Sequence, residues 1–271
     1  MCALASLSKP MRSGEYCETA CAYNYPGVFA MKMQKSNAVP IAALVLCCLA
    51  FLLLSFIACR HLGQMAVVEA QKHPETIVID AGHGGEDGGA TGLSAQPEKV
   101  INLAISKDLQ QLLTAAGYRV VMTRTSDISL SDPLNTIRER KISDIHNRMK
   151  LINAQGNCIF VSIHQNFFEQ SQYHGTQVFY SKNDMESKEL AESIRGQVVG
   201  LLQKDNTRAV KPATSSIYLL WNAKMPAVLV ECGFLSNSSE AQQLNQDAYQ
   251  RRMAFAIYCG LLSYCNAESS G

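Results

Sequence analysis

The chain has 271 residues, of which 47% are apolar and 17% are charged, and its formal net charge is +1. This composition fits one compact domain with a hydrophobic segment and excludes a fibrous or wholly disordered chain. The near-neutral charge also argues against nucleic acid as a partner, because polyanions are bound through a basic excess.

The clearest local feature is the apolar run from Ile41 to Cys59, which contains no charged residue. At about 1.5 Å per residue, a helix of this length crosses nearly all of a hydrocarbon core of about 30 Å. Lys32 and Lys35 precede the run and Arg60 follows it, which favours a cytoplasmic N-terminus and an external C-terminal domain. We therefore expect this run to be a single-pass membrane anchor.

Other interpretations of the N-terminal region stay open. A signal peptide, cleaved or uncleaved, has a similar apolar core, although no small-x-small cleavage motif follows at the usual distance. Lipidation at Cys59 fits less well, because Phe56 and Ile57 stand where other residues are expected before a lipidated cysteine. Residues 1–40 are either a short tail or partly a start-site artefact, and residues 60–75 are predicted to be a linker.

Cysteine usage does not predict a disulfide-stapled fold. Six of the ten cysteines lie in or before the apolar run, which leaves Cys158, Cys232, Cys259 and Cys265 in the C-terminal domain. These four have neither the density of a disulfide framework nor zinc-finger spacing. Cys158 and Cys232 fall in apolar runs, and we expect them to be small core residues.

From Thr76 onward, apolar β-like runs alternate with stretches of helical period. This pattern predicts a single layered α/β domain, with a mostly parallel or mixed central sheet flanked by helices. We expect it to span residues 76–265, followed by a tail at 266–271. The predicted strands are 76–80, 118–123, 158–163, 176–180 and 227–231. The predicted helices are 98–116, 143–154, 185–204 and a last one that runs from an Asn237/Glu240 capping box to about residue 264.

Three residues that can bind a metal stand at the ends of these elements. His83 follows the first strand, Glu98 opens the first helix and His164 follows the third strand. Ligands gather at the carboxyl ends of strands in open α/β sheets, so these side chains can converge. Two histidines and one carboxylate are typical of a catalytic zinc site, which keeps a position open for water. Taken singly, a histidine in a glycine loop is more often structural, and a glutamate at a helix start is explained by the helix dipole.

Glu231 ends the apolar run 227–230, where a buried carboxylate is costly without a cation nearby. It is therefore the residue expected to act as general acid/base. It would take a proton from the water at the metal and hand it to the departing amine.

Five motifs extend this interpretation. IVIDAGHGGEDGGATG, EKVINL, VVMTRTSD, SIHQN and PAVLVECGFLSN occur in the order and separation seen in the zinc-dependent N-acetylmuramoyl-L-alanine amidases, the family often called amidase type 3. The chain resembles this family over roughly residues 76–264. The resemblance implies that His83, Glu98 and His164 bind one Zn²⁺ and that Glu231 is catalytic. It also marks recurring positions for which bracing roles are expected rather than substrate contact: Asn102, Arg124, Arg148, Asn153 and Asn166.

The implied substrate is the peptidoglycan amide that joins N-acetylmuramic acid to L-alanine, the first residue of the stem peptide. The compact layout is similar to anchored, single-domain amidases of spore-forming bacteria, in which stem-peptide removal precedes muramic lactam formation in the cortex. The domain would then lie outside the cell membrane or in the forespore intermembrane space. General wall turnover or cell separation is the alternative role, and the need for an activating partner protein stays open.

Two alternatives from other functional classes were weighed. Cys232 with His83 or His164 could form a cysteine hydrolase, but strand alternation would point Cys232 away from Glu231. An inactive wall-binding module that keeps the amidase fold is the other alternative. The presence of all four site residues argues against it.

Overall fold

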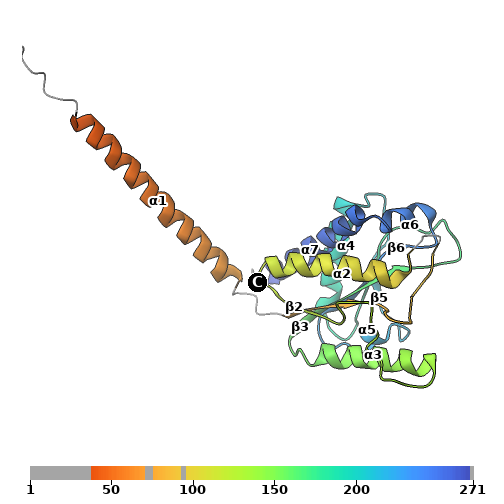
Figure 1. Cartoon of the computed structure of the whole chain (residues 1–271). Coiled ribbons are helices and arrows are strands. Elements are labelled where there is room, and N and C mark those ends of the chain that lie inside the picture. Colours follow the sequence, from red (N-terminus) through yellow and green to blue (C-terminus); the bar gives the residue numbers. More distant parts are fainter. Residues whose placement is uncertain (1–37, 71–75, 93–95, 269–271) are drawn as a thin grey trace, which may run out of the picture. The chain divides into compact units, whose positions relative to one another are not determined.

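The computed structural model describes residues 38–70, 76–92 and 96–268 (Figure 1). The chain divides after Ile57 into two units, which are described separately. Helix α1 (Ala38–Ala70) contains the predicted membrane segment, and its window Ala43–Arg60 has a mean hydropathy of 2.5. Among the described residues it is the one helix long and apolar enough to cross a membrane, a property that signal sequences share.

The helix α1 extends beyond the predicted segment at both ends. It begins at Ala38, inside the predicted tail, and continues to Ala70, so most of the predicted linker is helical. The stretch 60–70 contains no proline and only one glycine, and nothing in it stops a helix. Residues 1–37 of the predicted tail and 71–75 of the predicted linker lie outside the described residues.

The C-terminal unit is built on a mixed sheet of order β2-β1-β3-β6-β4-β5, as predicted. β4 runs antiparallel to β6, and the other neighbouring strands are parallel. The central strands β3 and β6 are buried along most of their length, which explains their apolar sequences. The strands are β1 (Thr76–Ala81), β2 (Arg119–Met122), β3 (Cys158–Asn166), β4 (Gln177–Tyr180), β5 (Lys211–Pro212) and β6 (Ala227–Phe234).

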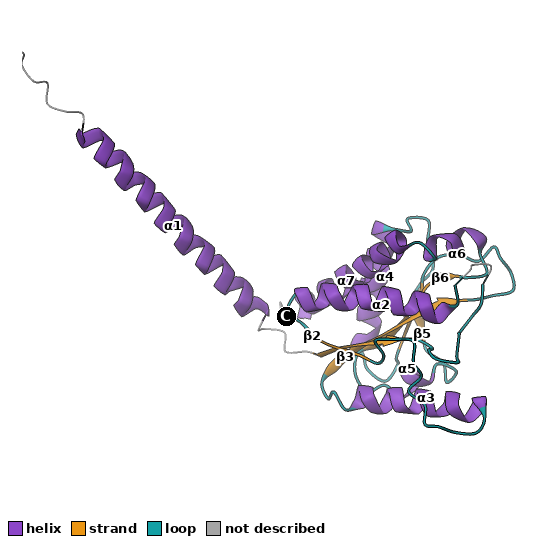
Figure 2. Ribbon diagram, viewed as in Figure 1, coloured by secondary structure: helices purple, strands orange, loops and turns teal. Residues whose placement is uncertain are grey.

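Helices cover both faces of this sheet, as Figure 2 shows: α2, α4 and α7 lie on one face, α3 and α5 on the other. Each face buries its own apolar cluster, the larger one under α2, α4 and α7. The helices of this unit are α2 (Glu98–Ala115), α3 (Ile137–Asn153), α4 (Glu186–Leu201), α5 (Tyr218–Asn222), α6 (Ser238–Leu244) and α7 (Asp247–Glu268).

Two predicted helices have different bounds. α3 starts at Ile137 instead of 143, because Thr136 and Glu139 form a reciprocal capping box ahead of a polar first turn. The predicted last helix is two helices, α6 and α7, separated at Asn245, and α7 extends through residues 266–268 of the predicted tail. Residues 269–271 lie outside the described residues.

The Asn237/Glu240 pattern also works differently from a capping box. The Asn237 side chain caps α6 by accepting from the backbone N–H groups of Ser239 and Glu240. The Glu240 carboxylate instead accepts from the N–H groups of Gly175 and Phe234, at 2.9 and 2.8 Å. Glu240 therefore ties the loop before β4 to the end of β6.

Candidate metal centre

His83 lies in a tight loop directly after β1, and its φ of 63° is in the left-handed region. This conformation is uncommon for a residue other than glycine, so surrounding contacts must hold it. Gly84 donates its N–H to the Asp87 carbonyl at 3.0 Å, and Arg148 donates to the His83 carbonyl at 2.7 Å. A Cβ on Gly84 would lie 2.3 Å from the Ile128 carbonyl oxygen, so the turn requires glycine there.

The imidazole of His83 is oriented by a carboxylate. Its Nδ1 atom lies 2.8 Å from Asp87 Oδ2, while its Nε2 atom lies 3.2 Å from Glu98 Oε2. A proton on Nδ1 directed at Asp87 leaves Nε2 free as a metal ligand, the arrangement found around many metal-binding histidines. Burial lowers the pKa of His83, but the hydrogen bonds to Asp87 and Glu98 raise it to about 9.

Glu98 is buried in the first turn of α2 and lies between the two histidines. Its Oε1 atom is 2.9 Å from His164 Nδ1 and accepts the Gln165 backbone N–H at 3.0 Å. Its Oε2 atom accepts the Ala90 N–H at 2.8 Å, so protein groups fix both oxygens. Burial raises the pKa of Glu98, but the hydrogen bonds to His164 and His83 hold it well below its usual range.

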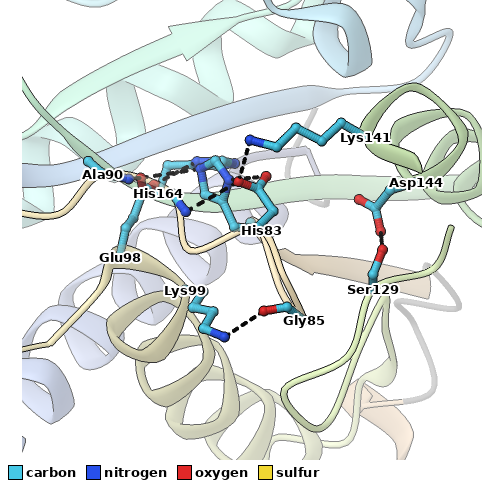
Figure 3. Close-up of polar contacts among 12 residues, drawn as sticks. His83, Gly85, Ala90, Glu98, Lys99, Ser129, Lys141, Asp144 and His164 are labelled. Atoms are coloured by element: carbon cyan, nitrogen blue, oxygen red, sulfur yellow. Dashed lines mark hydrogen bonds and ion pairs between the residues drawn. The ribbon is translucent and has the colours of Figure 1, made fainter. Parts of the chain in front are cut away.

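The three predicted ligands therefore converge, as Figure 3 shows. One donor atom from each of His83, Glu98 and His164 lies within 4.8 Å of the others, and the two imidazole centroids are 4.9 Å apart in an edge-to-face arrangement. Gly82 makes room for His164, because a Cβ there would lie 2.2 Å from its Nε2 atom. The donors are two imidazole nitrogens and one carboxylate, a set that suits Zn²⁺ and leaves a coordination position for water.

Glu231 lies beside these residues. In the parallel β3–β6 pairing its Cα partner is His164, so both side chains are on the same face of the sheet. Its Oε2 atom is buried and accepts no hydrogen bond from any described residue. Burial raises the pKa of Glu231 to about 7, against the opposing effect of His164. A buried carboxylate oxygen without a partner is costly, and such groups concentrate at functional sites.

Two buried arginines support the loop that carries His83. Arg148 donates to Asp80 at 2.6 Å and to the Ala81 carbonyl at 2.9 Å, and Arg124 donates to the carbonyls of Ala81 and Gly82 at 2.8 and 3.0 Å. Arg148 also bonds Asp144 of its own helix. We call Arg124, Arg148 and the groups they contact the arginine brace. These contacts are the bracing roles predicted for the two arginines.

Asn102 also braces the site, since its Nδ2 atom contacts the Gly82 carbonyl and Glu98 Oε1, each at 3.2 Å. Asn166 ends β3 two residues beyond His164 and lines a groove described below. Asn153 is the last residue of α3, where its carbonyl accepts the Gly156 N–H at 3.4 Å.

The structure places Cys232 and two further histidines away from the site. Cys232 is fully buried in the cluster under α2, α4 and α7, on the other face from Glu231, and burial raises the pKa of its thiol. A cysteine nucleophile is therefore excluded. His146 and His174 are exposed and contribute no atom to the three-residue cluster.

Asp87 is a functional residue that the sequence did not indicate. It holds His83 on one side, and on the other its Oδ1 atom lies 2.8 Å from Lys141 Nζ of α3, which Figure 3 shows reaching toward the site. These two contacts, with burial opposing them, leave the pKa of Asp87 well below its usual range. The only sequence signal was a carboxylate four residues after His83, and in an irregular loop that spacing fixes no geometry.

Two histidines, a carboxylate and a buried glutamate whose Oε2 atom accepts no hydrogen bond from a described residue lie at one end of an α/β sheet. They define a site of the kind used by metal-dependent hydrolases. The comparisons with known proteins specify the family. The family model described as N-acetylmuramoyl-L-alanine amidase matches residues 77–263. The chain belongs to this family, whose members hydrolyse the amide bond between N-acetylmuramic acid and L-alanine in peptidoglycan.

Three similar proteins illustrate this membership. The germination-specific N-acetylmuramoyl-L-alanine amidase of Bacillus subtilis is 36% identical over 189 residues, which cover 69% of this chain and 78% of the relative. The CwlD amidase of Clostridioides difficile, solved in complex with the GerS lipoprotein, is 42% identical with a TM-score of 0.69. That match covers 71% of this chain and 99% of the solved one. An N-acetylmuramoyl-L-alanine amidase from Clostridium difficile 630 is 32% identical, with a TM-score of 0.62 and coverage of 71% and 97%.

Proposed function

We propose that this amidase binds one Zn²⁺ through His83, Glu98 and His164 and uses Glu231 as its general acid/base. The observation that supports this most strongly is the convergence of the three donor side chains, within 4.8 Å, beside a buried glutamate oxygen without a partner. Glu98 at the start of α2 and Glu231 on β6 lie at the same end of the sheet, but their surroundings differ. Glu98 is held by backbone N–H groups, as a ligand should be, whereas Glu231 is left free to exchange a proton.

The protein residues would share the reaction as follows. A bound Zn²⁺ supplies Lewis-acid chemistry, which polarises the scissile carbonyl and acidifies a water molecule. Glu231 takes the proton from the attacking water and returns it to the nitrogen of the departing L-alanine. Asp87 keeps the imidazole of His83 in one tautomer, and the arginine brace keeps its backbone in the left-handed conformation.

The comparison with two relatives favours a role in the spore cortex over a role in general wall turnover. The chain covers 78% of the germination-specific relative of Bacillus subtilis. LytC of the same species is also 36% identical, but the match covers only 35% of that longer protein. The match therefore extends over most of the germination-specific relative but over only about a third of LytC, which favours the germination type. Deletion of the gene should give spores without muramic lactam if the role is in the cortex, whereas intact lactam with altered cell separation would favour wall turnover.

We further propose that α1 anchors the chain and that the catalytic unit faces outward, in the external or forespore intermembrane space. The 18-residue apolar window supports an anchor, and peptidoglycan, the substrate of the family, lies outside the cytoplasmic membrane. The solved CwlD–GerS complex supports asking whether this chain also needs an activating lipoprotein.

The metal and the acid/base are tested on the full chain purified in detergent. We expect one Zn²⁺ per chain by elemental analysis, and loss of muropeptide cleavage after chelation with recovery when Zn²⁺ is restored. Glu231→Gln should lower kcat by about 10² to 10⁴-fold while zinc content stays the same. Glu189→Gln, an exposed change on α4, is the matched control. Full cleavage by Glu231→Gln, or cleavage that survives removal of zinc, would contradict the proposal.

A further inference from the structure

A second concave feature adjoins the metal centre on the side of β6 and β4. It is a groove of about 250 Å³ at the carboxyl end of β3 and β6. Its walls are aromatic and basic, and none of its lining residues, all of which are described, is acidic. We call it the aromatic–basic groove, and its principal residues are Phe168, Tyr173, Gln177, Arg208, Lys211 and Phe234.

Strand register places this groove next to Glu231. Gln177 of β4 is the Cα partner of Glu231 in the antiparallel β4–β6 pairing, so the two residues are direct neighbours. Asn166, another lining residue, stands two residues beyond His164 on β3 and pairs with Phe234. A substrate whose scissile bond lies between His164 and Glu231 therefore has the groove beside it.

Arg208 is fixed in the groove by stacking. Its Cζ atom lies 4.6 Å from the centroid of the Phe234 ring and 5.8 Å from that of Tyr173, and its Nε atom donates to the His174 carbonyl at 2.7 Å. No described residue accepts a hydrogen bond from its terminal Nη atoms. A guanidinium stacked in this way keeps in-plane N–H groups available for a planar carboxylate.

The Glu240 carboxylate does not neutralise this charge by a direct hydrogen bond. Glu240 interacts with Arg208 through space, but its two oxygens already accept the N–H groups of Gly175 and Phe234. Lys211 adds a second positive charge to the groove. The groove therefore favours an anion over a neutral ligand.

Gln177 supplies independent evidence that the groove binds a ligand. Its side chain is only 2% exposed, and its Nε2 atom donates to the Ala209 carbonyl at 2.7 Å. Its Oε1 atom is buried and accepts no hydrogen bond from any described residue. Buried polar atoms nearly always have a partner, so an N–H group of a bound ligand is the natural donor here.

We propose that the aromatic–basic groove binds the stem peptide on the leaving-amine side of the bond that is cut, with Arg208 on a free peptide carboxylate. This rests on the proposed function. The second residue of a stem peptide, D-glutamate, is linked through its γ-carboxyl and keeps an α-carboxylate one residue beyond the L-alanine that bears the scissile nitrogen. The peptide also offers N–H groups to Gln177. The glycan of peptidoglycan offers far less negative charge near this bond, so charge complementarity selects the peptide.

Calorimetric binding of the released product tests the proposal without requiring turnover. The full chain in detergent is titrated with L-Ala-γ-D-Glu-diaminopimelate and with the same tripeptide amidated at the α-carboxylate of D-glutamate. For the wild type we expect the amidated peptide to bind at least about tenfold more weakly. Arg208→Gln should weaken binding of the acidic peptide by a similar factor and lose the discrimination between the two peptides.

Control variants keep the test independent of folding. Arg208→Lys retains a charge but not the fork of donors, so its affinity for the acidic peptide should be intermediate. Lys188→Gln, which removes an exposed charge on α4 outside the groove, should bind like the wild type. The thermal unfolding midpoint of each variant shows whether it is folded. If Arg208→Gln is unfolded, the binding of Arg208→Lys is compared with that of the wild type instead.

Two results would overturn the proposal: equal binding of both peptides by the wild type, or full discrimination retained by Arg208→Gln. Loss of disaccharide binding instead of peptide binding in Arg208→Gln would also overturn it, because the groove would then hold glycan. Failure of the proposed function looks different. In that case an intact muropeptide is not cleaved, while the released peptide still binds with its preference for a free carboxylate.

Discussion

The two sides of the metal centre are built in opposite ways. On the β1 side, the arginine brace holds the His83 loop with buried charge pairs and donors to three consecutive carbonyls, those of Ala81, Gly82 and His83. On the β6 side, Glu231 and Gln177 are neighbours, and each has one buried side-chain oxygen that accepts no hydrogen bond from a described residue. The protein thus completes the bonding where it must hold ligands still and leaves it incomplete where substrate and protons must exchange.

The largest expected effect comes from removing Arg148 from the arginine brace. Arg148 is 3% exposed and joins Asp80 of β1 to Asp144 of α3. Arg148→Met leaves two carboxylates without their cation, so we expect a loss of about 3–5 kcal/mol in the free energy of unfolding. Urea unfolding measures this loss. Arg138→Met, on the exposed side of the same helix, should change stability by less than about 0.5 kcal/mol.

If Arg148→Met were as stable as the wild type, the brace would not be what holds the β1 side. The contrast with the β6 side gives a second check, since Glu231→Gln should leave stability unchanged or raise it. That variant removes a buried charge whose Oε2 atom accepts no hydrogen bond from a described residue.

The next largest effect is on metal affinity. A Cβ on Gly82 would lie 2.2 Å from His164 Nε2, so Gly82→Ala must displace that imidazole. We expect zinc affinity to fall by about 10- to 100-fold, as when the support of a ligand is lost. Competition with a chromogenic chelator measures it. Gly196→Ala on α4, where an added Cβ meets nothing within 4 Å, is the control, and an equal loss of affinity there would refute the steric explanation.

The pH dependence of the free energy of unfolding measures what ionised Asp80 contributes to stability. Burial raises its pKa, but the charges of Arg148 and His164 and a hydrogen bond from Ser162 lower it to about 2 in the folded chain, against about 3.9 when unfolded. Because the folded pKa is the lower one, the stabilisation is complete above pH about 4 and is lost as the pH falls from about 4 to about 2. It amounts to about 2 kcal/mol. The stability gap between wild type and Asp80→Asn should therefore shrink over this interval, and a constant gap would contradict the assignment.

The convergence of the three predicted metal ligands could be inferred from their positions along a strand or at a helix start. His83, Glu98 and His164 converge because the ends of β1 and β3 and the start of α2 must meet at one edge of the sheet. Glu231 was likewise placed by the end of an apolar run. These inferences needed only the strand pattern and the topology of an α/β sheet.

The parts that could not be predicted depend on side chains from irregular segments. Asp87 orients His83 from within a loop, and Arg208 reaches the groove from the poorly patterned stretch before β5. Contacts of this kind follow from tertiary packing, which no local period encodes. The early start of α3 was missed for another reason: the capping residues Thr136 and Glu139 precede a polar turn without an apolar stripe.

The smallest effect tests whether that first turn belongs to the brace. Thr136 Oγ1 accepts the Glu139 N–H at 3.2 Å, and Thr136→Ala should cost about 1 kcal/mol of stability. Lys141, whose Nζ atom contacts Asp87, follows directly after this first turn, but the buried Arg148 lies about two turns beyond Lys141 and should keep α3 in place. Zinc affinity should therefore stay unchanged, with Thr207→Ala at an exposed loop position as the control. If Thr136→Ala weakens zinc binding as much as Gly82→Ala does, the support of His83 runs through Lys141 and Asp87, and the rigid side of the site extends to the surface of the molecule.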